Sequence, residues 1–201
     1  RLRRIYCLEK MFEVRRYTAA DAPQWNEFVA KSKNGTFLFD RRYMDYHSDR
    51  FHDASLIAER NGAMYALLPG NVVDQTFYSH QGLTYGGLIL GCEATTVHVM
   101  ECFSRFNDCL RQAGIRRVVY KAKPWIYHLQ PAEEPIYAMH RTCRYRLLER
   151  DLSSTIRLHT PLKWKKDRRH GLRLARERGI VVSRSDDYEA FWDILTENLH
   201  T

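Results

Sequence analysis

The residues best suited to chemistry lie in one stretch, Ser79 to Leu90, which reads SHQGLTYGGLIL. His80 has a reference pKa suited to a general base, and Tyr85 carries a hydroxyl that could meet a ligand. Glycine inside an apolar run often marks a bulge or a place where another molecule lies against the backbone. A strand of this kind before a helix can present free backbone N–H groups to a ligand. The alternative is a bulged core strand with structural roles for His80 and Tyr85. The neighbouring candidates for substrate binding are Ser79, Thr84, Gly86 and Gly87.

A second group of candidates follows the strand predicted at Ile115–Lys121. Lys121 and Lys123 alternate with the aromatic residues Trp125 and Tyr127. Basic and aromatic side chains at the carboxyl end of a strand suit an anionic or sugar ligand. An exposed loop without a ligand is the alternative.

The basic charge of the chain is concentrated in one segment. Of the formal net charge of +8, +7 comes from Thr155 to Ile180, where nine arginines and lysines face two acidic residues. Such a local excess indicates a surface for anions, and a solvated helix face is the alternative. The candidate anion-binding residues are Lys163, Lys165, Lys166, Arg168, Arg169 and Arg173.

The composition fits a folded protein with a substantial core, because 44% of the 201 residues are hydrophobic. No apolar run approaches the roughly 20 residues needed to span a bilayer. The five cysteines are dispersed and contain no Cys-x-x-Cys pair, which favours free thiols in a reducing, cytoplasmic setting and argues against a metal site. We interpret residues 1–11 as an N-terminal extension, with Met11 as a candidate natural start.

The elements that must position these residues alternate between strands and helices. Thr18 with Asp21 predicts a helix start, with Pro23 in the first turn. Asp40 is a candidate cap for a short second helix, and Asn61-Gly62 predicts a tight hairpin. A strand, helix, strand order around the long helix implies a parallel crossover. The predicted strands are 12–17, 54–60, 63–68, 72–78, 83–90, 115–121, 145–151 and 180–182. The predicted helices are 41–47, 94–113, 132–142, 162–178 and one after Asp186.

This order resembles a GNAT (N-acetyltransferase) domain and is closest to the Fem-type (FemAB-like) acyltransferases, which carry two such domains in tandem. The resembling pieces are NGTFLFDRRYMDYHSDRF, ALLPG and SHQGLTYGGL in the first part, and STIRL and an arginine-rich helix followed by GIVV near the junction. The resemblance implies a mixed α/β sheet flanked by helices. It also implies a first domain at 12–153 and a truncated start of a second domain at 154–201.

The resemblance implies acyl transfer from acyl-CoA or aminoacyl-tRNA to an amine, with tRNA as a possible partner. GNAT domains bind acceptors near the loop that contains Asp40, Arg41 and Tyr43, so Arg41 could meet a phosphate or carboxylate; a solvated charged helix start is the alternative. The Gln/Arg-x-x-Gly-x-Gly/Ala pattern that holds the donor's pyrophosphate is absent from the first domain. This fits a Fem-type arrangement in which the first domain holds the acceptor.

We therefore predict an acyltransferase for an amine on a cell-wall precursor or a sugar-linked metabolite, with His80 and Tyr85 as catalytic candidates. The rival prediction is a non-catalytic module that binds RNA or another polyanion through residues 157–178. A third possibility is a structural fragment without activity of its own.

Overall fold

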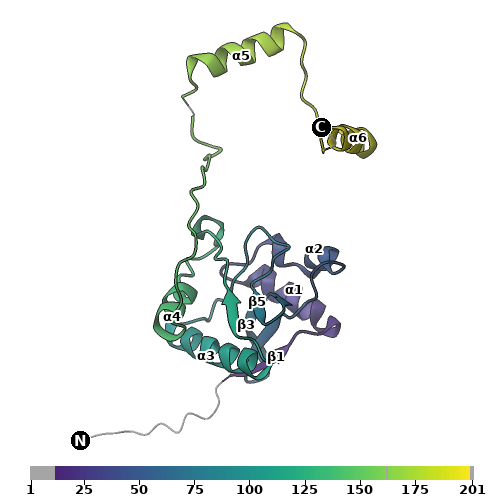
Figure 1. Ribbon diagram of the computed structural model, residues 1–201. Helices are drawn as coiled ribbons and strands as arrows, with labels where there is room; N and C mark the ends of the chain where they lie inside the picture. The colour runs from purple at the N-terminus through teal and green to yellow at the C-terminus, as the bar shows by residue number, and fades with distance from the viewer. Residues whose placement is uncertain (1–11, 162, 200–201) are drawn as a thin grey trace, which may run out of the picture. The chain divides into compact units, whose positions relative to one another are not determined.

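The computed structural model describes residues 12–161 and 163–199. The predicted extension, residues 1–11, lies outside this range, and so does Leu162, where the basic helix was predicted to begin. The chain divides into two units with the boundary between Leu148 and Glu149. The first unit is a mixed α/β structure in which helices flank the sheets, so the predicted fold class is confirmed (Figure 1).

The main sheet contains four antiparallel strands in the order β1-β2-β3-β6. Strand β2 and strand β3 form the predicted hairpin, and its two turn residues, Asn61 and Gly62, both have positive φ angles. Asparagine and glycine tolerate this conformation best, which explains the turn at this position. The strands are β1 (Glu13–Arg16), β2 (Leu56–Arg60), β3 (Ala63–Leu68) and β6 (Ile89–Leu90).

A second sheet has the order β4-β5-β7. The strand predicted at 72–78 is instead a hairpin of β4 (Asn71–Val73) and β5 (Thr76–Tyr78). The chain reverses at Asp74, which has a φ of 54°. Strand β5 pairs in parallel with β7 (Arg117–Val119). The parallel crossover predicted between 83–90 and 115–121 is wrong, because β6 pairs with β3 in the main sheet and β7 lies in the second sheet.

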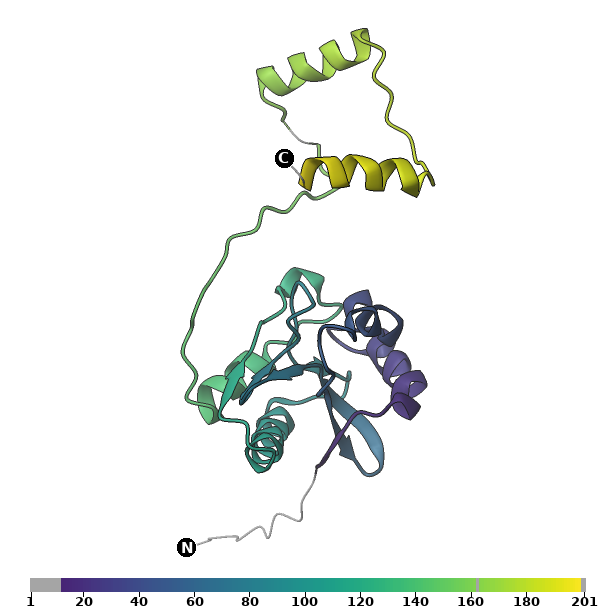
Figure 2. The same cartoon turned by 45° about the vertical axis from the view of Figure 1, so that its right-hand side comes forward.

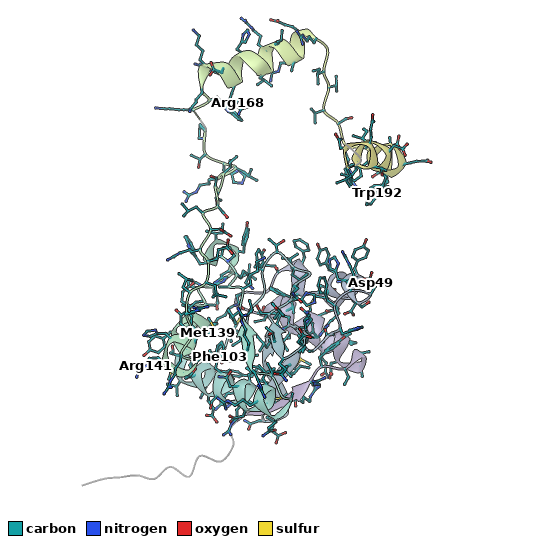
Figure 3. The ribbon with its side chains drawn as sticks, viewed as in Figure 1. Asp49, Phe103, Met139, Arg141, Arg168 and Trp192 are labelled. Atoms are coloured by element: carbon teal, nitrogen blue, oxygen red, sulfur yellow. The ribbon has the colours of Figure 1, made fainter. Side chains whose placement is uncertain are left out.

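Helices cover both faces of the main sheet (Figure 1 and Figure 2). Helix α1 (Ala22–Lys31) packs Trp25 and Val29 against one face. Helices α3 (Thr96–Gln112) and α4 (Glu134–Thr142) cover the other, where Phe103 and Met139 are buried in one cluster (Figure 3). Alternate residues of the strands, such as Leu56 and Ile57, face the two cores.

Short helical turns connect these elements. They are η1 (Ala19–Asp21), η2 (Phe37–Phe39), α2 (Arg41–Met44), η3 (Asp45–His47) and η4 (Trp125–Tyr127). Asp40 caps α2 as predicted, because its carboxylate accepts a hydrogen bond from the Arg42 backbone N–H.

In the second unit, the structure shows α5 (Lys166–Glu177) and α6 (Tyr188–Leu199). The strands predicted at 145–151 and 180–182 do not form. No described residue of this unit is buried, and the rings of Phe191 and Trp192 are exposed. A strand forms only where a partner can accept its backbone hydrogen bonds, and neither segment has one among the described residues.

Candidate functional site

The predicted strand 83–90 is wrong for all but Ile89 and Leu90. Residues 79–88 instead follow an irregular path beside residues 119–121, and we call this contact the glycine seam. Three hydrogen bonds hold it: Ser79 N–H to the Val119 carbonyl at 2.9 Å, Lys121 N–H to Ser79 Oγ at 2.7 Å, and Gly86 N–H to the Lys121 carbonyl at 2.9 Å. The buried Ser79 hydroxyl therefore serves the backbone.

The two glycines of the seam are explained by contacts within the chain. A Cβ at Gly86 would overlap the carbonyl oxygen of Ser79. Gly87 has a φ of +91°, and a Cβ there would lie 2.6 Å from the hydroxyl of Tyr120. The close approach that glycine permits is thus made by the chain's own backbone and by Tyr120. These contacts account for both glycines without a ligand.

The prediction of free backbone N–H groups in this stretch is also wrong for the residues that lead into β6. Leu88 N–H donates to the Tyr120 hydroxyl at 2.8 Å, and Leu90 N–H donates to Asn34 Oδ1 at 2.9 Å. Asn34 Nδ2 in turn donates to the Leu88 carbonyl at 2.9 Å. The loop after α1 therefore occupies this edge, and burial of Tyr120 raises the pKa of its hydroxyl.

Side chains from three separate segments meet next to the seam, and we call them the Tyr85 cluster: Phe39, Tyr85, Lys123, Tyr127 and His128. The ring of Tyr85 stacks on Tyr127, with 5.4 Å between centroids and 25° between planes. Phe39 lies 6.5 Å from Tyr85, and Lys123 Nζ lies 4.5 Å from the Phe39 centroid. The cluster thus joins an aromatic surface to an amine.

Lys123 has the most unusual environment in the cluster. Its Nζ is buried and has no hydrogen-bond partner, and its close neighbour is the face of Phe39. Burial lowers the pKa of Lys123 to about 7, because an ammonium ion loses its hydration there without gaining a counter-charge. The nearby His128 imidazole also has a buried, unpartnered Nδ1, and burial, with the Lys123 charge, lowers its pKa. Lys123 can therefore exchange a proton near neutral pH.

His80 lies apart from the Tyr85 cluster, against Phe51, with 6.0 Å between the ring centroids. It is 4% exposed, has a φ of 81°, and its Nδ1 has no partner. Burial lowers the pKa of His80 to about 4, so the ring is neutral at physiological pH. A neutral imidazole can accept a proton, but a pKa of about 4 makes His80 a weak base at neutral pH.

The structure corrects the interpretation of Arg41. Contact with an acceptor and a solvated helix start, the two alternatives from the sequence, both require an exposed side chain. Arg41 is 2% exposed, and its guanidinium pairs with Asp53. The guanidinium carbon lies 3.3 Å from the ring centroid of Tyr17 and 4.2 Å from that of Trp25. The side chain therefore belongs to the core beneath α2 and is not available to an acceptor.

The other predicted residues are placed at or near the surface. Asp40 binds the exposed Arg42, and the hydrogen bond from that side chain lowers the pKa of Asp40. Tyr43 is 42% exposed and contacts Phe37 edge-on. Thr84, Lys121 and Trp125 are exposed. The structure thus places Tyr85 and Lys123 next to the same ring, that of Phe39, and leaves His80 and Asp40 outside the cluster.

Sequence reasoning missed Phe39 and His128. Phe39 lies in an apolar turn, where an aromatic residue looks like ordinary core. His128 follows the alternating run of Lys121, Lys123, Trp125 and Tyr127 closely enough to have been added to it. Neither sequence position shows that the two side chains meet at Lys123.

The basic segment keeps its charges in solvent. Lys165, Lys166, Arg168 and Arg169 are exposed, and none of them has an acidic partner among the described residues. Arg173 pairs with Glu177 on the same helix at 3.5 Å.

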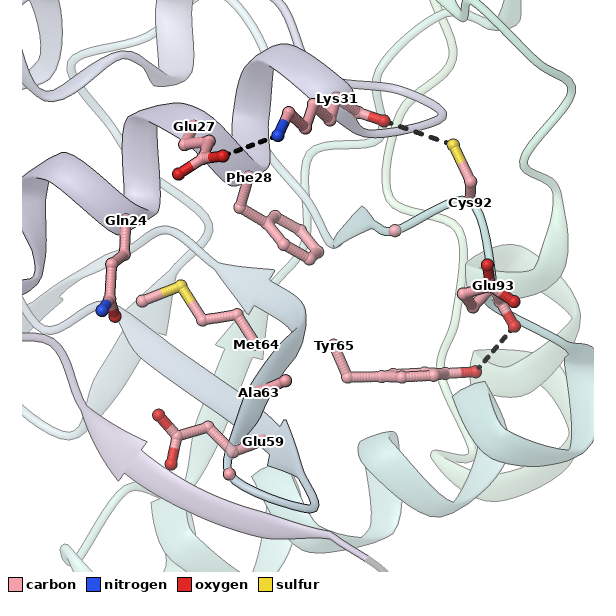
Figure 4. Close-up of a pocket in the computed structure, with 12 residues that line it drawn as sticks. Gln24, Glu27, Phe28, Lys31, Glu59, Ala63, Met64, Tyr65, Cys92 and Glu93 are labelled. Carbon is pink, nitrogen blue, oxygen red and sulfur yellow. Dashed lines mark hydrogen bonds and ion pairs between the residues drawn. The ribbon is translucent and has the colours of Figure 1, made fainter.

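A pocket of about 610 Å³ lies elsewhere in the first unit, between α1 and the β2–β3 hairpin (Figure 4). None of the residues predicted for the site lines it. In the described part of the chain, no group of three or more potential metal ligands comes together. No helix in that part is long and apolar enough to cross a membrane.

No protein-family model matches the sequence, and a search of curated proteins finds no relative. The chain is similar to several solved structures. One is aminoglycoside acetyltransferase meta-AAC0020 from an uncultured soil metagenomic sample, in complex with sisomicin, with 12% identity, coverage of 74% of this chain and 97% of that one, and a TM-score of 0.43.

Another is a ribosomal-protein-alanine N-acetyltransferase from Brucella melitensis biovar Abortus 2308, at 10% identity, 73% and 99% coverage, and a TM-score of 0.44. A third is a GNAT family acetyltransferase from Staphylococcus aureus, at 7% identity, 73% and 99% coverage, and a TM-score of 0.42. Similarity at this level supports no inference about activity or substrate.

Proposed function

We propose that the full-length protein transfers an acyl or aminoacyl group to an amine, and that the first unit holds this acceptor beside Tyr85. The observation that carries the proposal is Lys123. Its amine is buried, lacks a hydrogen-bond partner and packs on Phe39, which Tyr85 also contacts. Acyl transfer by direct attack needs a proton acceptor near neutral pH, and this group has the required pKa of about 7.

The chemistry assigns one role to each residue. The acceptor arrives as an ammonium ion, and neutral Lys123 takes one proton from it, so that the free amine can attack the acyl carbonyl. The new C–N bond forms, and the bond to the thiol of CoA or the ribose oxygen of tRNA breaks. The Tyr85 hydroxyl is proposed to donate a hydrogen bond to the developing oxyanion. The attacking nitrogen, now positively charged, gives its second proton to the leaving thiolate or ribose oxygen, and Lys123 releases the first proton to water.

The donor is proposed to be acyl-CoA or aminoacyl-tRNA, bound outside the first unit. Two observations support this placement. The N–H groups of Gly86, Leu88 and Leu90 already have partners within the chain. The glycine-rich pyrophosphate pattern is also absent from this part of the sequence. The Fem-type assignment, with residues 154–201 as the start of a second, similar domain, rests on the sequence motifs and remains part of the proposal.

The acceptor class is inferred from the surface next to the cluster. Tyr127 and Trp125 are 49% and 71% exposed, and Lys121 is exposed nearby in the sequence. Exposed aromatic faces and a cation suit a sugar ring with an attached anionic group. We therefore propose an amine on a cell-wall precursor or a sugar-linked metabolite.

The test uses the full-length protein with acetyl-CoA and with aminoacyl-tRNA, first in calorimetric titrations and then in single-turnover transfer to amine-bearing sugars. We expect one donor to bind. We expect Lys123→Met to leave donor binding unchanged and to lower the transfer rate by about 10²-fold or more. Absence of binding for both donors would contradict the enzyme assignment.

The rival function, a binding module for RNA or another polyanion, is favoured by the exposed cations of α5 and its flanks. It predicts RNA binding that weakens steeply with salt and survives both Tyr85→Ala and Lys123→Met. Binding that is lost in either variant would argue against the module.

A further inference from the structure

The pocket beside the β2–β3 hairpin is a feature that the proposed function does not use. Helix α1 forms one wall, the hairpin residues form another, and the loop before α3 closes a third side (Figure 4). Its volume of about 610 Å³ falls within the range of small-molecule sites. It contains no member of the Tyr85 cluster.

The pocket combines an apolar surface with an acidic lining. Phe28 from α1 and the hairpin residues Met64 and Tyr65 supply the apolar surface. The charged lining residues are three glutamates and one lysine: Glu27, Glu59, Glu93 and Lys31. The pocket therefore has a negative formal charge, which disfavours phosphates and carboxylates and favours a cation.

Ion pairs within the chain engage two of the three glutamates, and the third, Glu93, has no ion-pair partner among the described residues. Lys31 binds Glu27 at 2.6 Å, and Arg15, from outside the pocket, binds Glu59 at 2.7 Å. Among the described residues, the Glu93 carboxylate has no ion-pair or hydrogen-bond partner. Glu93 is exposed, and it is the lining glutamate that no described residue pairs with.

The loop that carries Glu93 is fixed in place by Tyr65. The Tyr65 hydroxyl donates to the Glu93 carbonyl at 3.3 Å and accepts from Thr95 N–H at 3.2 Å. Tyr65 and Glu93 both line the pocket, and the hydrogen bond drawn in Figure 4 fixes the Glu93 backbone beside the Tyr65 hydroxyl. A carboxylate beside an aromatic ring is an arrangement that binds ammonium groups, because the ion pair and the cation–π attraction act together.

We propose that this pocket binds an organic ammonium ion with an aliphatic or aromatic body. The ammonium group pairs with Glu93 next to the Tyr65 ring, and the body packs on Phe28 and Met64. This site goes beyond the proposed acyl transfer and is separate from the Tyr85 cluster, so a ligand here would be a second occupant.

The test is a titration of the full-length protein with 2-phenylethylammonium, followed by calorimetry and by two-dimensional NMR. Two matched probes, 2-phenylethanol and phenylacetate, keep the body and remove or invert the charge. We expect binding in the order ammonium, alcohol, carboxylate, with shift changes at Phe28, Met64 and Glu93. Equal affinity for the ammonium and the alcohol, or no ammonium binding at millimolar concentration, would overturn the proposal.

Variants separate the pocket from other acidic surfaces. Glu93→Gln removes the charge at constant volume and should weaken ammonium binding about fivefold while leaving the alcohol unchanged. Met64→Trp fills the pocket and should abolish binding of both. Asp74→Asn, at an exposed turn far from the lining residues in sequence, is the matched control and should have no effect. Equal weakening by Asp74→Asn would show a diffuse surface effect and contradict a site.

Tyr85→Ala distinguishes this proposal from the acyltransferase assignment. It should impair acyl transfer and leave 2-phenylethylammonium binding intact. Loss of ammonium binding in a folded Tyr85→Ala protein would contradict a separate site.

Discussion

At the scale of single residues, two buried side-chain nitrogens without hydrogen-bond partners determine the acid–base properties of the first unit. Lys123 Nζ and His80 Nδ1 are both buried polar atoms without partners. Burial favours the neutral form of each and lowers the pKa of Lys123 to about 7 and that of His80 to about 4, although the charge of Asp53 partly offsets the shift of His80. The lysine is left poised to exchange a proton at neutral pH, whereas the histidine is held neutral.

Lys123 should reduce stability at neutral pH. Its pKa is 10.5 in the unfolded chain and about 7 in the folded one, so between these values the unfolded state binds more protons and stability rises with pH. Replacement by methionine removes the free-energy cost of burying a lysine that is protonated in the unfolded chain. We expect Lys123→Met to raise the free energy of unfolding at pH 7 by about 1 kcal/mol or more. The gain should shrink toward pH 10.5 in urea titrations, and a gain that is independent of pH would contradict this origin.

His80 should make the fold sensitive to mild acid. As the pH falls from 6.5 to about 4, His80 becomes protonated in the unfolded state but stays neutral in the folded state. The free energy of unfolding therefore decreases across this pH range. The loss from this group should reach about 2 kcal/mol at pH 4. The His80→Asn variant accommodates the positive φ, removes the titration, and should lose less stability between pH 7 and pH 4 in urea titrations. Equal acid sensitivity of the two proteins would contradict the assignment.

At the scale of elements, the glycine seam explains why the strand predicted at 83–90 fails. The apolar content favoured a strand, but Gly86 lies so close to the Ser79 carbonyl that the chain follows an irregular path here. Side chains of Asn34 and Tyr120 then replace a neighbouring strand for Leu88 and Leu90. Such long-range partners leave no local signal in the sequence.

The seam can be tested with two glycine substitutions of opposite expected effect. Gly86→Ala places a methyl group on the Ser79 carbonyl and should lower the free energy of unfolding by about 2 kcal/mol or more. Gly171→Ala, in the open middle of α5, should raise the helicity of that segment and favour the helix by up to about 1 kcal/mol. Circular dichroism during urea unfolding measures both, and a neutral Gly86→Ala would contradict the close approach.

Local signals predicted the helices well because caps and periodicity act within a few residues. Asp40 caps α2, and Pro23 opens α1, as the sequence indicates. Val97 in the first turn of α3 is 73% exposed whereas Val99 is buried, because residues two positions apart on a helix point in nearly opposite directions. Arg41 was missed as a core residue because only the fold brings Tyr17, Trp25 and Asp53 around it.

At the scale of the whole molecule, charge and burial are divided between the two units. The first unit contains the buried clusters, whereas the described part of the second has no buried residue and carries the exposed basic helix. The concentration of basic charge in one segment could be predicted from the sequence, because it requires only counting charged residues along the chain. The Tyr85 cluster was predicted in part, since Tyr85 and Lys123 were chosen for chemistry while their contact through Phe39 depends on the fold.

The basic helix provides a prediction at this scale. If α5 binds a polyanion, replacing Lys166, Arg168 and Arg169 with glutamine should weaken RNA binding and reduce the slope of log K against log salt by about 3 for duplex contacts. Fluorescence anisotropy at several salt concentrations measures both quantities. An unchanged slope would show that these three residues do not contact the RNA phosphates.

The proposal depends on Lys123 having a neutral amine near Tyr85 at physiological pH. The pKa of Lys123 can be measured without knowing the substrate. Lysine side chains labelled with ¹³C by reductive methylation report their protonation by NMR. One resonance should titrate near pH 7 and disappear in Lys123→Arg. A Lys123 resonance that titrates near 10.5 with the other lysines would contradict it.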